Sequence, residues 1–331
     1  MMKKILLVYT GGTIGMVKKE DVLSPFNFDE LKTAFPELKD CGSILDHVTI
    51  SEPIDSSNMS IHVWIELANC IKKNYTKYDG FVILHGSDTM AYTASMLSFM
   101  LEGISKPVIL TGSQLPIGIK RTDAKENLIT SIEIAASNIV KEVCVYFEYQ
   151  LYRGNRVVKV NADNFDAFQS PNYPVLAKAG VKIKYKKQYI NNPIVSEINI
   201  HTNISDDVGI LKLFPSIKKE VVKAVLDSSK GIILQTFGSG NATTNNWFIE
   251  ELTNAIKKDK VIVNISQCLF GSVNQGHYQT SEILQKIGVI SGHDMTLEAA
   301  LTKLMFLLGA RLDRKEICKK IETNLRGEIT I

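Results

Sequence analysis

The sequence predicts an α/β protein with two α/β domains: a larger N-terminal domain with a mostly parallel sheet flanked by helices, and a smaller C-terminal α/β domain. Three observations carry this prediction. At 331 residues, the chain is longer than a single hydrophobic core usually serves. Short apolar, β-prone runs alternate with segments of helical length, which is typical of βαβ units. The alternation weakens once, beyond Tyr185, and then resumes.

The expected strands of the first half run into turns that contain glycine or small polar residues. The first apolar run stops at Gly11 and Gly12, as expected of a buried parallel strand that enters a tight turn. The expected elements are strands at 5–9, 80–84, 108–110 and 143–147 and helices at 89–101 and 123–136. In an open parallel sheet, sites lie at the carboxyl ends of such strands.

The second half begins after a segment rich in Asn and Lys that contains one expected exposed strand. Its expected elements are strands at 208–213, 231–235 and 261–265 and helices at 216–227, 245–257 and 297–308. The predicted organisation is therefore a catalytic N-terminal domain over 1–188, a linker over 189–207 and a C-terminal domain over 208–331.

Composition narrows the class of partner. The formal net charge is +3, and 38 Lys and Arg residues are interspersed with 35 Asp and Glu residues. Because no basic stripe emerges, we expect no nucleic-acid partner. The composition is that of a soluble globular protein, so we expect no membrane span either. A small molecule is the expected partner.

The cysteines predict neither a disulfide framework nor a structural zinc site. They are odd in number and widely scattered, without any CxxC or Cys/His ligand spacing. The positions are Cys41, Cys70, Cys144, Cys268 and Cys318.

The apolar run at 5–9 is too short for the core of a signal peptide. We therefore expect a cytoplasmic protein.

Three strand ends in the first half each deliver a hydroxyl group. These are Thr13 in TGGTIG, Ser87 beside Asp88 in HGSDT, and Ser113 in TGSQ. Such residues commonly do no more than cap the helix that follows. Three similar turns that converge on one crevice of a parallel sheet favour a functional site.

A threonine nucleophile requires a base and a stabilised oxyanion. His85 ends a strand and is one candidate base, although a buried histidine can equally be a core residue. Lys159 in RVVKVN is the other candidate, because desolvation makes the neutral amine of a lysine available, but spacing alone favours an ordinary surface lysine. These alternatives stay open on the residues alone.

Two further segments have more than one interpretation. TGGTIG after a strand fits a phosphate-binding turn, but it lacks the GK[ST] ending of a P-loop and does not match GxGxxG. DSSNM, with Asp55, Ser56 and Ser57, suits either a helix cap or a site for the charged groups of an amino acid.

Taken together, these motifs resemble the bacterial-type L-asparaginases, and specifically their cytoplasmic type I branch. The segments that carry the likeness are, in chain order, YTGGTIGM, DSSNM, HGSDTMAYTAS, LTGSQLP, RTDAKENL, LYRGNRVVK, FDAFQSPNYP, GSGNA, QCLFGSVN and DMTLEAALTK. The resemblance covers nearly the whole chain.

The resemblance implies hydrolysis of L-asparagine to L-aspartate and ammonia, without a metal or organic cofactor. It implies that Thr13 is the nucleophile and that water releases an acyl-enzyme intermediate. It further implies that Ser87, Asp88 and Lys159 act together in catalysis. The residues that it assigns to substrate binding are Asp55, Ser56, Ser57, Ser87, Asp88 and Ser113.

The family's assembly implies a homodimer or homotetramer in which the neighbour's smaller domain completes each active site. Asn241 in the GSGN loop is the expected contribution. Two departures from the family pattern stand out. Ser87 occupies a position that is usually threonine, which keeps the hydroxyl but loses the methyl group that restricts its rotamer. The loop at 18–26 contains no tyrosine and has Leu23 in the expected place, so Tyr9 or another group substitutes, or no phenol is needed.

Two alternative functions remain open, and a third is disfavoured. A broader glutaminase-asparaginase differs by one substrate methylene, which is worth only about 1–3 kcal/mol of discrimination. An inactive amino-acid-binding homologue keeps the pocket without turnover. The amidotransferase subunits that act on charged tRNA share the domain, but the near-neutral charge of this chain argues against tRNA binding.

Overall fold

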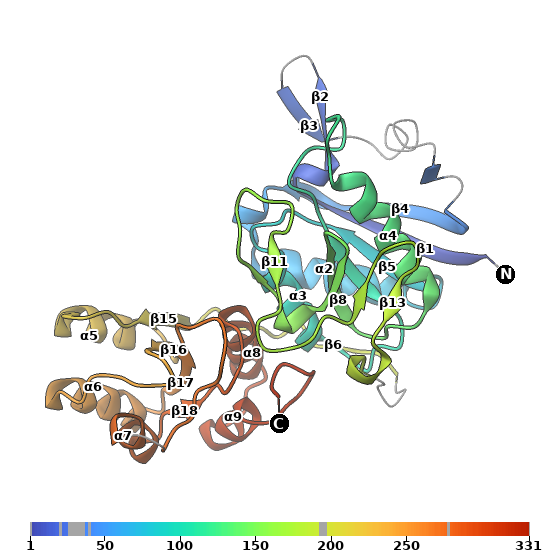
Figure 1. Ribbon diagram of the computed structural model, residues 1–331. Coiled ribbons are helices and arrows are strands. Elements are labelled where there is room, and N and C mark those ends of the chain that lie inside the picture. The colour runs from blue at the N-terminus through green and yellow to red at the C-terminus, as the bar shows by residue number, and fades with distance from the viewer. Residues whose placement is uncertain are drawn as a thin grey trace. The chain divides into compact units, whose positions relative to one another are not determined.

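The computed structural model describes residues 2–19, 22–25, 37–38, 41–191, 197–276 and 279–330. The chain divides into two units: unit 1 comprises Met1–Ser170 and Pro174–Thr202, and unit 2 comprises Pro171–Tyr173 and Asn203–Ile331. Each unit contains a sheet with helices packed on it (Figure 1). The predicted fold class is confirmed.

Unit 1 is built on an eight-stranded sheet in the order β13-β12-β9-β8-β7-β5-β1-β4. Its strands are β1 (Lys3–Gly11), β4 (Ser43–Ile54), β5 (Gly80–Leu84), β7 (Val108–Thr111), β8 (Val143–Phe147), β9 (Gln150–Arg153), β12 (Ala177–Lys178) and β13 (Lys184–Tyr185). The segment from β4 to β8 is parallel, and β9, β12 and β13 extend it in antiparallel pairings. β5 and β8 are buried along their whole length because helices cover the parallel segment.

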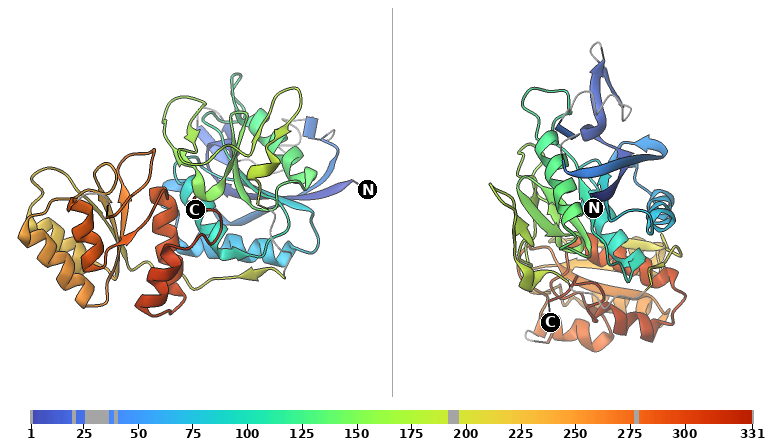
Figure 2. Two further views of the ribbon diagram at one scale, coloured as in Figure 1. Left: turned by 60° about the horizontal axis from the view of Figure 1, so that its bottom comes forward. Right: turned by 90° about the vertical axis from the view of Figure 1, so that its right-hand side faces the viewer.

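The main helices of unit 1 are α2 (Ile61–Asn74), α3 (Met90–Met100) and α4 (Ala124–Ser137). The right-hand view of Figure 2 shows α2 and α4 on opposite faces of the sheet. α3 is apolar almost all round and is buried from Met90 to Met100 apart from Tyr92, as expected of a helix enclosed by neighbouring elements.

Short elements connect this framework. They are η1 (Thr13–Gly15), β2 (Met16–Lys19), β3 (Val22–Pro25), η3 (Ser56–Asn58), β6 (Leu101–Glu102), η4 (Gly154–Arg156), β10 (Val158–Lys159), β11 (Phe168–Gln169), η5 (Lys187–Tyr189) and β14 (Asn199–Ile200). β14 is the short strand expected beyond Tyr185, and it pairs with β6 of unit 1.

Unit 2 contains a parallel four-stranded sheet in the order β15-β16-β17-β18. Its elements are β15 (Val208–Lys212), α5 (Lys219–Ser228), β16 (Gly231–Thr236), α6 (Asn246–Lys257), β17 (Val261–Ser266), α7 (Gln279–Ile287), β18 (Ile290–Ser291), α8 (Leu297–Gly309) and α9 (Arg314–Ile321). α5, α6 and α7 share one apolar core with β15, β16 and β17. α8 and α9 lie on the other face (Figure 1).

Two global properties follow from the described residues. Every described helix is too short or too polar to traverse a lipid bilayer. The five cysteines are all free thiols.

Candidate active site

The turns that contain Thr13, Ser56, Ser87 and Ser113 follow the carboxyl ends of β1, β4, β5 and β7, which are neighbours in the sheet of unit 1. This side of the sheet is called the sheet edge below. The register aligns these ends, since Tyr9 of β1 lies opposite Leu84 of β5, and Leu84 lies opposite Thr111 of β7. On the other side, Gly11 of β1 lies opposite Ile54 of β4. The carboxyl ends of β1, β5 and β7 therefore meet, as the sequence predicts, and the end of β4, a strand that the sequence did not predict, lies beside them.

The turns after these strands are in direct contact. A Cβ added at Gly12 would lie 2.5 Å from the Cα of Gly86, and one added at Gly86 would lie 2.5 Å from the Oγ of Ser56. Only glycine fits this approach at positions 12 and 86. The Thr89 hydroxyl also donates to the Ser56 carbonyl over 2.7 Å. The TGGT, DSS and HGSDT segments thus form one continuous surface.

Thr13 begins η1, directly after β1. The preceding Gly12 has a φ of 82°, a left-handed conformation that glycine adopts at little cost. Thr13 is half-buried. Its hydroxyl forms no hydrogen bond with another residue of the described ranges. The hydroxyl predicted to be the nucleophile is therefore not engaged by any described residue.

Tyr9 supports the Thr13 turn from beneath. Its hydroxyl donates to the Gly15 carbonyl over 3.0 Å, and a Cβ at Gly15 would lie 2.0 Å from the tyrosine ring. Burial raises the pKa of Tyr9 to about 12, because the phenolate would lose its hydration. Tyr9 is thus a neutral phenol at physiological pH, held against the backbone of the turn.

Lys159 joins the turn after β5 from a distant part of the chain. It lies on β10, which pairs antiparallel with β11. Its Nζ donates to the Ser87 Oγ over 2.9 Å and to the Asp88 Oδ1 over 2.5 Å. The Lys159 side chain is 17% exposed and the Asp88 side chain 65% exposed. The arrangement links a hydroxyl, an amine and a carboxylate, the groups that proton transfer requires.

Gln114, which is not among the predicted site residues, contacts Ser87. Its Oε1 accepts from the Ser87 Oγ over 3.4 Å, and its Nε2 donates to the carbonyl of Asn164 over 2.9 Å. The signal for it in the sequence is its place in TGSQ, directly after Ser113 at a strand end. The motif drew attention to the hydroxyl and not to the amide beside it.

The DSS segment has the geometry of a cap. Asp55 is exposed, and its Oδ1 accepts from both the backbone N–H and the hydroxyl of Ser57, each over 2.8 Å. These bonds, the backbone one foremost, hold the pKa of Asp55 below its usual value. Ser56 is buried against Gly86. The cap and a substrate contact are compatible, because a carboxylate has further acceptor sites.

Ser113 reaches the sheet edge but turns its hydroxyl into its own loop. The residue is 2% exposed, and its Oγ donates to the Leu115 carbonyl over 2.7 Å. Only the oxygen lone pairs of Ser113 could therefore serve a ligand. Its role in substrate binding stays a prediction.

His85, one of the two candidate bases, is a core residue. It is fully buried, its Nδ1 lies 2.7 Å from the Gly86 carbonyl, and its Nε2 lies 2.9 Å from the Thr93 Oγ1. A carbonyl accepts only, so Nδ1 carries the proton and Nε2 accepts from Thr93. Burial lowers the pKa of His85 to about 4. Both ring nitrogens are engaged away from the Thr13 hydroxyl, which leaves Lys159 as the candidate base.

Two predicted features fall outside this group of residues. Asn241 lies in a turn of unit 2, where its backbone N–H donates to the Phe237 carbonyl over 2.8 Å. In the loop at 18–26, the β2 and β3 backbones pair antiparallel, while the side chain of Leu23 and residues 20, 21 and 26 lie outside the described part of the chain.

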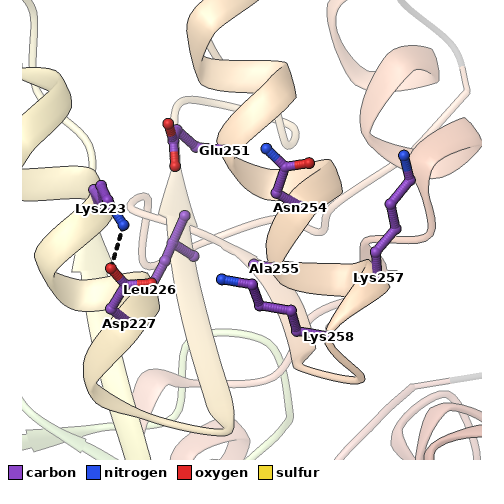
Figure 3. Close-up of a pocket in the computed structure, with 8 residues that line it drawn as sticks. All are labelled: Lys223, Leu226, Asp227, Glu251, Asn254, Ala255, Lys257 and Lys258. Atoms are coloured by element: carbon purple, nitrogen blue, oxygen red, sulfur yellow. Dashed lines mark hydrogen bonds and ion pairs between the residues drawn. The ribbon is translucent and has the colours of Figure 1, made fainter.

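A separate groove on unit 2 lacks the features of a catalytic site. It has a volume of ≈ 410 Å³ and lies between α5 and α6 (Figure 3). Its lining includes an ion pair between the Lys223 Nζ and the Asp227 Oδ2, 2.5 Å apart on the surface. Most of the lining side chains are charged, and none is a serine, threonine or cysteine that could act as a nucleophile. Within the described ranges, no cluster of three or more His, Cys, Asp or Glu residues is arranged to hold a metal ion.

Comparison with known proteins finds similar sequences for both parts of the chain. Residues 4–191 match the family "Asparaginase, N-terminal", and residues 207–320 match "Glutaminase/Asparaginase C-terminal domain". The chain is 44% identical to L-asparaginase 1 of Escherichia coli K12 over 340 aligned residues, covering 99% of this chain and 98% of that protein.

Solved structures give the same result. The structure of L-asparaginase I from Vibrio cholerae matches with a TM-score of 0.93 at 40% identity, covering 100% of both chains. A probable cytoplasmic L-asparaginase from Campylobacter jejuni matches with a TM-score of 0.80 at 28% identity, covering 97% of this chain and 100% of that one. Both halves of the sequence and the fold of the whole chain therefore agree, and the chain belongs to the asparaginase family.

Proposed function

We propose that this chain hydrolyses the side-chain amide of L-asparagine to L-aspartate and ammonia, with Thr13 as the nucleophile. The proposal rests on the hydrogen bonds of the Lys159 amine to Ser87 and Asp88. These residues follow β5, whose end lies beside the end of β1, the strand that precedes Thr13. The likeness to L-asparaginase 1 of Escherichia coli supports the choice of substrate.

The first step forms an ester. The Thr13 oxygen attacks the amide carbon, and its proton passes to Ser87 while Ser87 gives its own proton to the neutral form of the Lys159 amine. The C–N bond then breaks, and the nitrogen leaves as ammonia after receiving that proton. The product of this step is an aspartyl ester on Thr13.

The second step uses water as the nucleophile. Water attacks the ester carbonyl and loses a proton to Ser87 and Lys159, and the Thr13 oxygen recovers a proton as it leaves. We assign recognition of the substrate's α-ammonium and α-carboxylate to the DSS segment, Asp88 and Ser113. Asp88 is a suitable partner for an ammonium because much of its carboxylate faces solvent and can be covered by a ligand.

The experiment is ammonia release by the purified full chain, with L-asparagine and L-glutamine compared at equal concentrations. Faster release from L-asparagine is expected. Equal rates would favour the broader glutaminase-asparaginase. Binding of L-asparagine without ammonia release would contradict the proposal and favour an inactive amino-acid-binding homologue.

We further propose that the protein works in the cytoplasm as a homodimer or homotetramer, with Asn241 of one copy near the site of its neighbour. The free thiols of the five cysteines and the likeness to the cytoplasmic Campylobacter jejuni protein support the compartment. Mixing Thr13→Ala and Asn241→Ala chains tests the assembly: exchange of subunits that restores turnover supports it, and a monomer with full activity would reject it.

A further inference from the structure

Gln114 connects the turn that carries Ser87 to the loop that follows Lys159. Gln114 is half-buried in the turn after β7. Its Nε2 lies 2.9 Å from the Asn164 carbonyl oxygen and 3.3 Å from that of Ala162, while its Oε1 lies 3.4 Å from the Ser87 Oγ. One amide side chain thus spans two segments whose residues the proposed mechanism uses.

The orientation of this amide follows from hydrogen-bond chemistry. The carbonyl oxygens of Ala162 and Asn164 can only accept, so the nitrogen of the Gln114 amide must face them. The amide oxygen then faces Ser87. Because an amide oxygen cannot donate, the Ser87 hydroxyl is the donor in that contact.

The Ser87 proton therefore points towards Gln114 in the free protein. The Ser87 Oγ accepts from the Lys159 Nζ and donates towards Gln114. For Ser87 to pass its proton to Lys159, the hydroxyl must rotate from Gln114 to the amine. The contact over 3.4 Å is long for an O–H donor, so this rotation breaks only a weak bond.

Both ends of the connection are anchored. The backbone N–H of Gln114 donates to the buried carboxylate of Asp123 over 3.0 and 3.1 Å. In the opposite loop, the Asn161 Oδ1 accepts the backbone N–H groups of Asp163 and Asn164 over 2.8 and 3.0 Å. These bonds hold the backbone on both sides of the Gln114 amide.

We propose that Gln114 is a positioning residue for the proton relay: it holds the Ser87 hydroxyl in the resting direction and fixes the loop that follows Lys159. The proposal rests on the function proposed above. The Gln114 side chain contacts Ser87 and the loop after Lys159, so it acts on the proposed relay through these residues.

The test compares Gln114→Met, which keeps the length of the side chain without its polar atoms, with Gln114→Glu, which keeps an acceptor and adds a charge. For Gln114→Met we expect kcat to fall about 10- to 100-fold, with KM little changed, because the relay loses its geometry. Gln114→Glu, which keeps an acceptor towards Ser87 but repels the carbonyl oxygens of Ala162 and Asn164, should also lower kcat with KM little changed.

Gln267→Met is the matched control for lost stability. The Gln267 Nε2 donates to the carbonyls of Leu213 and Gln235 in unit 2, over 2.7 and 2.9 Å, so this variant removes a similar pair of bonds. A Gln114→Met enzyme with the kcat of the wild type, or one in which only KM changes, would overturn the proposal. So would equal losses of kcat in the two methionine variants. A wild-type chain that releases no ammonia from L-asparagine would instead reject the proposed function, and the relay role with it.

Discussion

Lys159 and Asp88 differ in their surroundings, and this difference separates catalysis from stability. The Lys159 side chain is 17% exposed, whereas its partner carboxylate is 65% exposed. An ion pair with one solvated member contributes only about 0.2–1 kcal/mol to folding, because solvent screens it. The pair in the free protein is therefore better explained by its place beside Ser87 than by stabilisation of the fold.

We predict that Lys159→Met lowers kcat by about 10²- to 10⁴-fold, the usual contribution of a general acid or base. The apolar side chain keeps the packing of the lysine stem, so the free energy of unfolding should change little. Steady-state kinetics and urea denaturation give the two values. A raised KM with an unchanged kcat would make Lys159 a binding residue.

His85 should make the protein sensitive to acid. Its folded pKa of about 4 lies below the usual 6.5, so the unfolded chain binds more protons between these values. Stability from this group is therefore complete above pH 6.5 and is lost as the pH falls towards 4. The linkage predicts a loss of about 2 kcal/mol between pH 7 and pH 5.

His85→Gln, which does not titrate, should remove this part of the pH dependence whatever its effect on absolute stability. Urea unfolding of the wild type and the variant at pH 7 and pH 5 gives the change in unfolding free energy between these pH values for each protein. Equal changes in the two proteins would contradict the buried, neutral state of His85.

At the scale of the element, the Thr13 turn depends on Tyr9 in the strand that precedes it. The tyrosine hydroxyl bonds the carbonyl at the end of η1, and the ring fills the space beside Gly15. We predict that Tyr9→Phe keeps the ring packing but lowers kcat, as the turn loses its hydrogen bond, with a cost to stability of about 0.5–1.5 kcal/mol. A phenylalanine variant with wild-type kcat would show that packing alone positions the turn.

The elements that the sequence predicts best are those with continuous apolar runs. β5 and β8 have the predicted bounds, because buried parallel strands are apolar on both faces. β4 was not predicted, since SILDHVTISEPI at the sheet edge mixes charged and apolar residues. The helix expected to begin at residue 216 begins at Lys219, because Ser216 has a φ of 65° and Lys218 is extended.

The hydroxyl groups of the candidate site were predictable from the sequence, whereas the contacts between residues far apart in the chain were not. Thr13, Ser87 and Ser113 follow strand ends, which the apolar pattern reveals. Lys159 lies on a two-residue strand that leaves no periodic signal, so the residues alone made it one of two candidate bases, and only the family resemblance favoured it over an ordinary surface lysine. Gln114 acts across 50 positions to Asn164, a pairing that exists only in the folded chain.

At the scale of the whole molecule, each unit has its own core. The functional division into 1–188, 189–207 and 208–331 stays a prediction. Unit 2 contains a fully buried ion pair between the Lys303 Nζ and the Glu328 Oε1, which are 2.5 Å apart. Lys303 also donates to the carbonyls of Ile321 and Thr323. This pair ties the end of the described chain to α8.

We predict that Lys303→Met destabilises the protein by about 3–5 kcal/mol, because it leaves the Glu328 carboxylate buried without its cation. Thermal or urea unfolding measures the loss. Lys223→Met, which breaks the surface pair with Asp227, is the control and should leave the unfolding free energy nearly unchanged. Similar effects of the two variants would contradict the role of burial.

Ammonia release by Thr13→Ala tests whether Thr13 is the nucleophile that opens the amide of L-asparagine. The hydroxyl lies in a turn and makes no hydrogen bond within the described residues, so its loss should leave the circular dichroism spectrum and the unfolding midpoint unchanged. We predict that kcat falls by about 10³-fold or more in Thr13→Ala, while Thr13→Ser, which keeps a hydroxyl, retains measurable turnover. A folded Thr13→Ala enzyme that releases ammonia at a rate near that of the wild type would contradict the account.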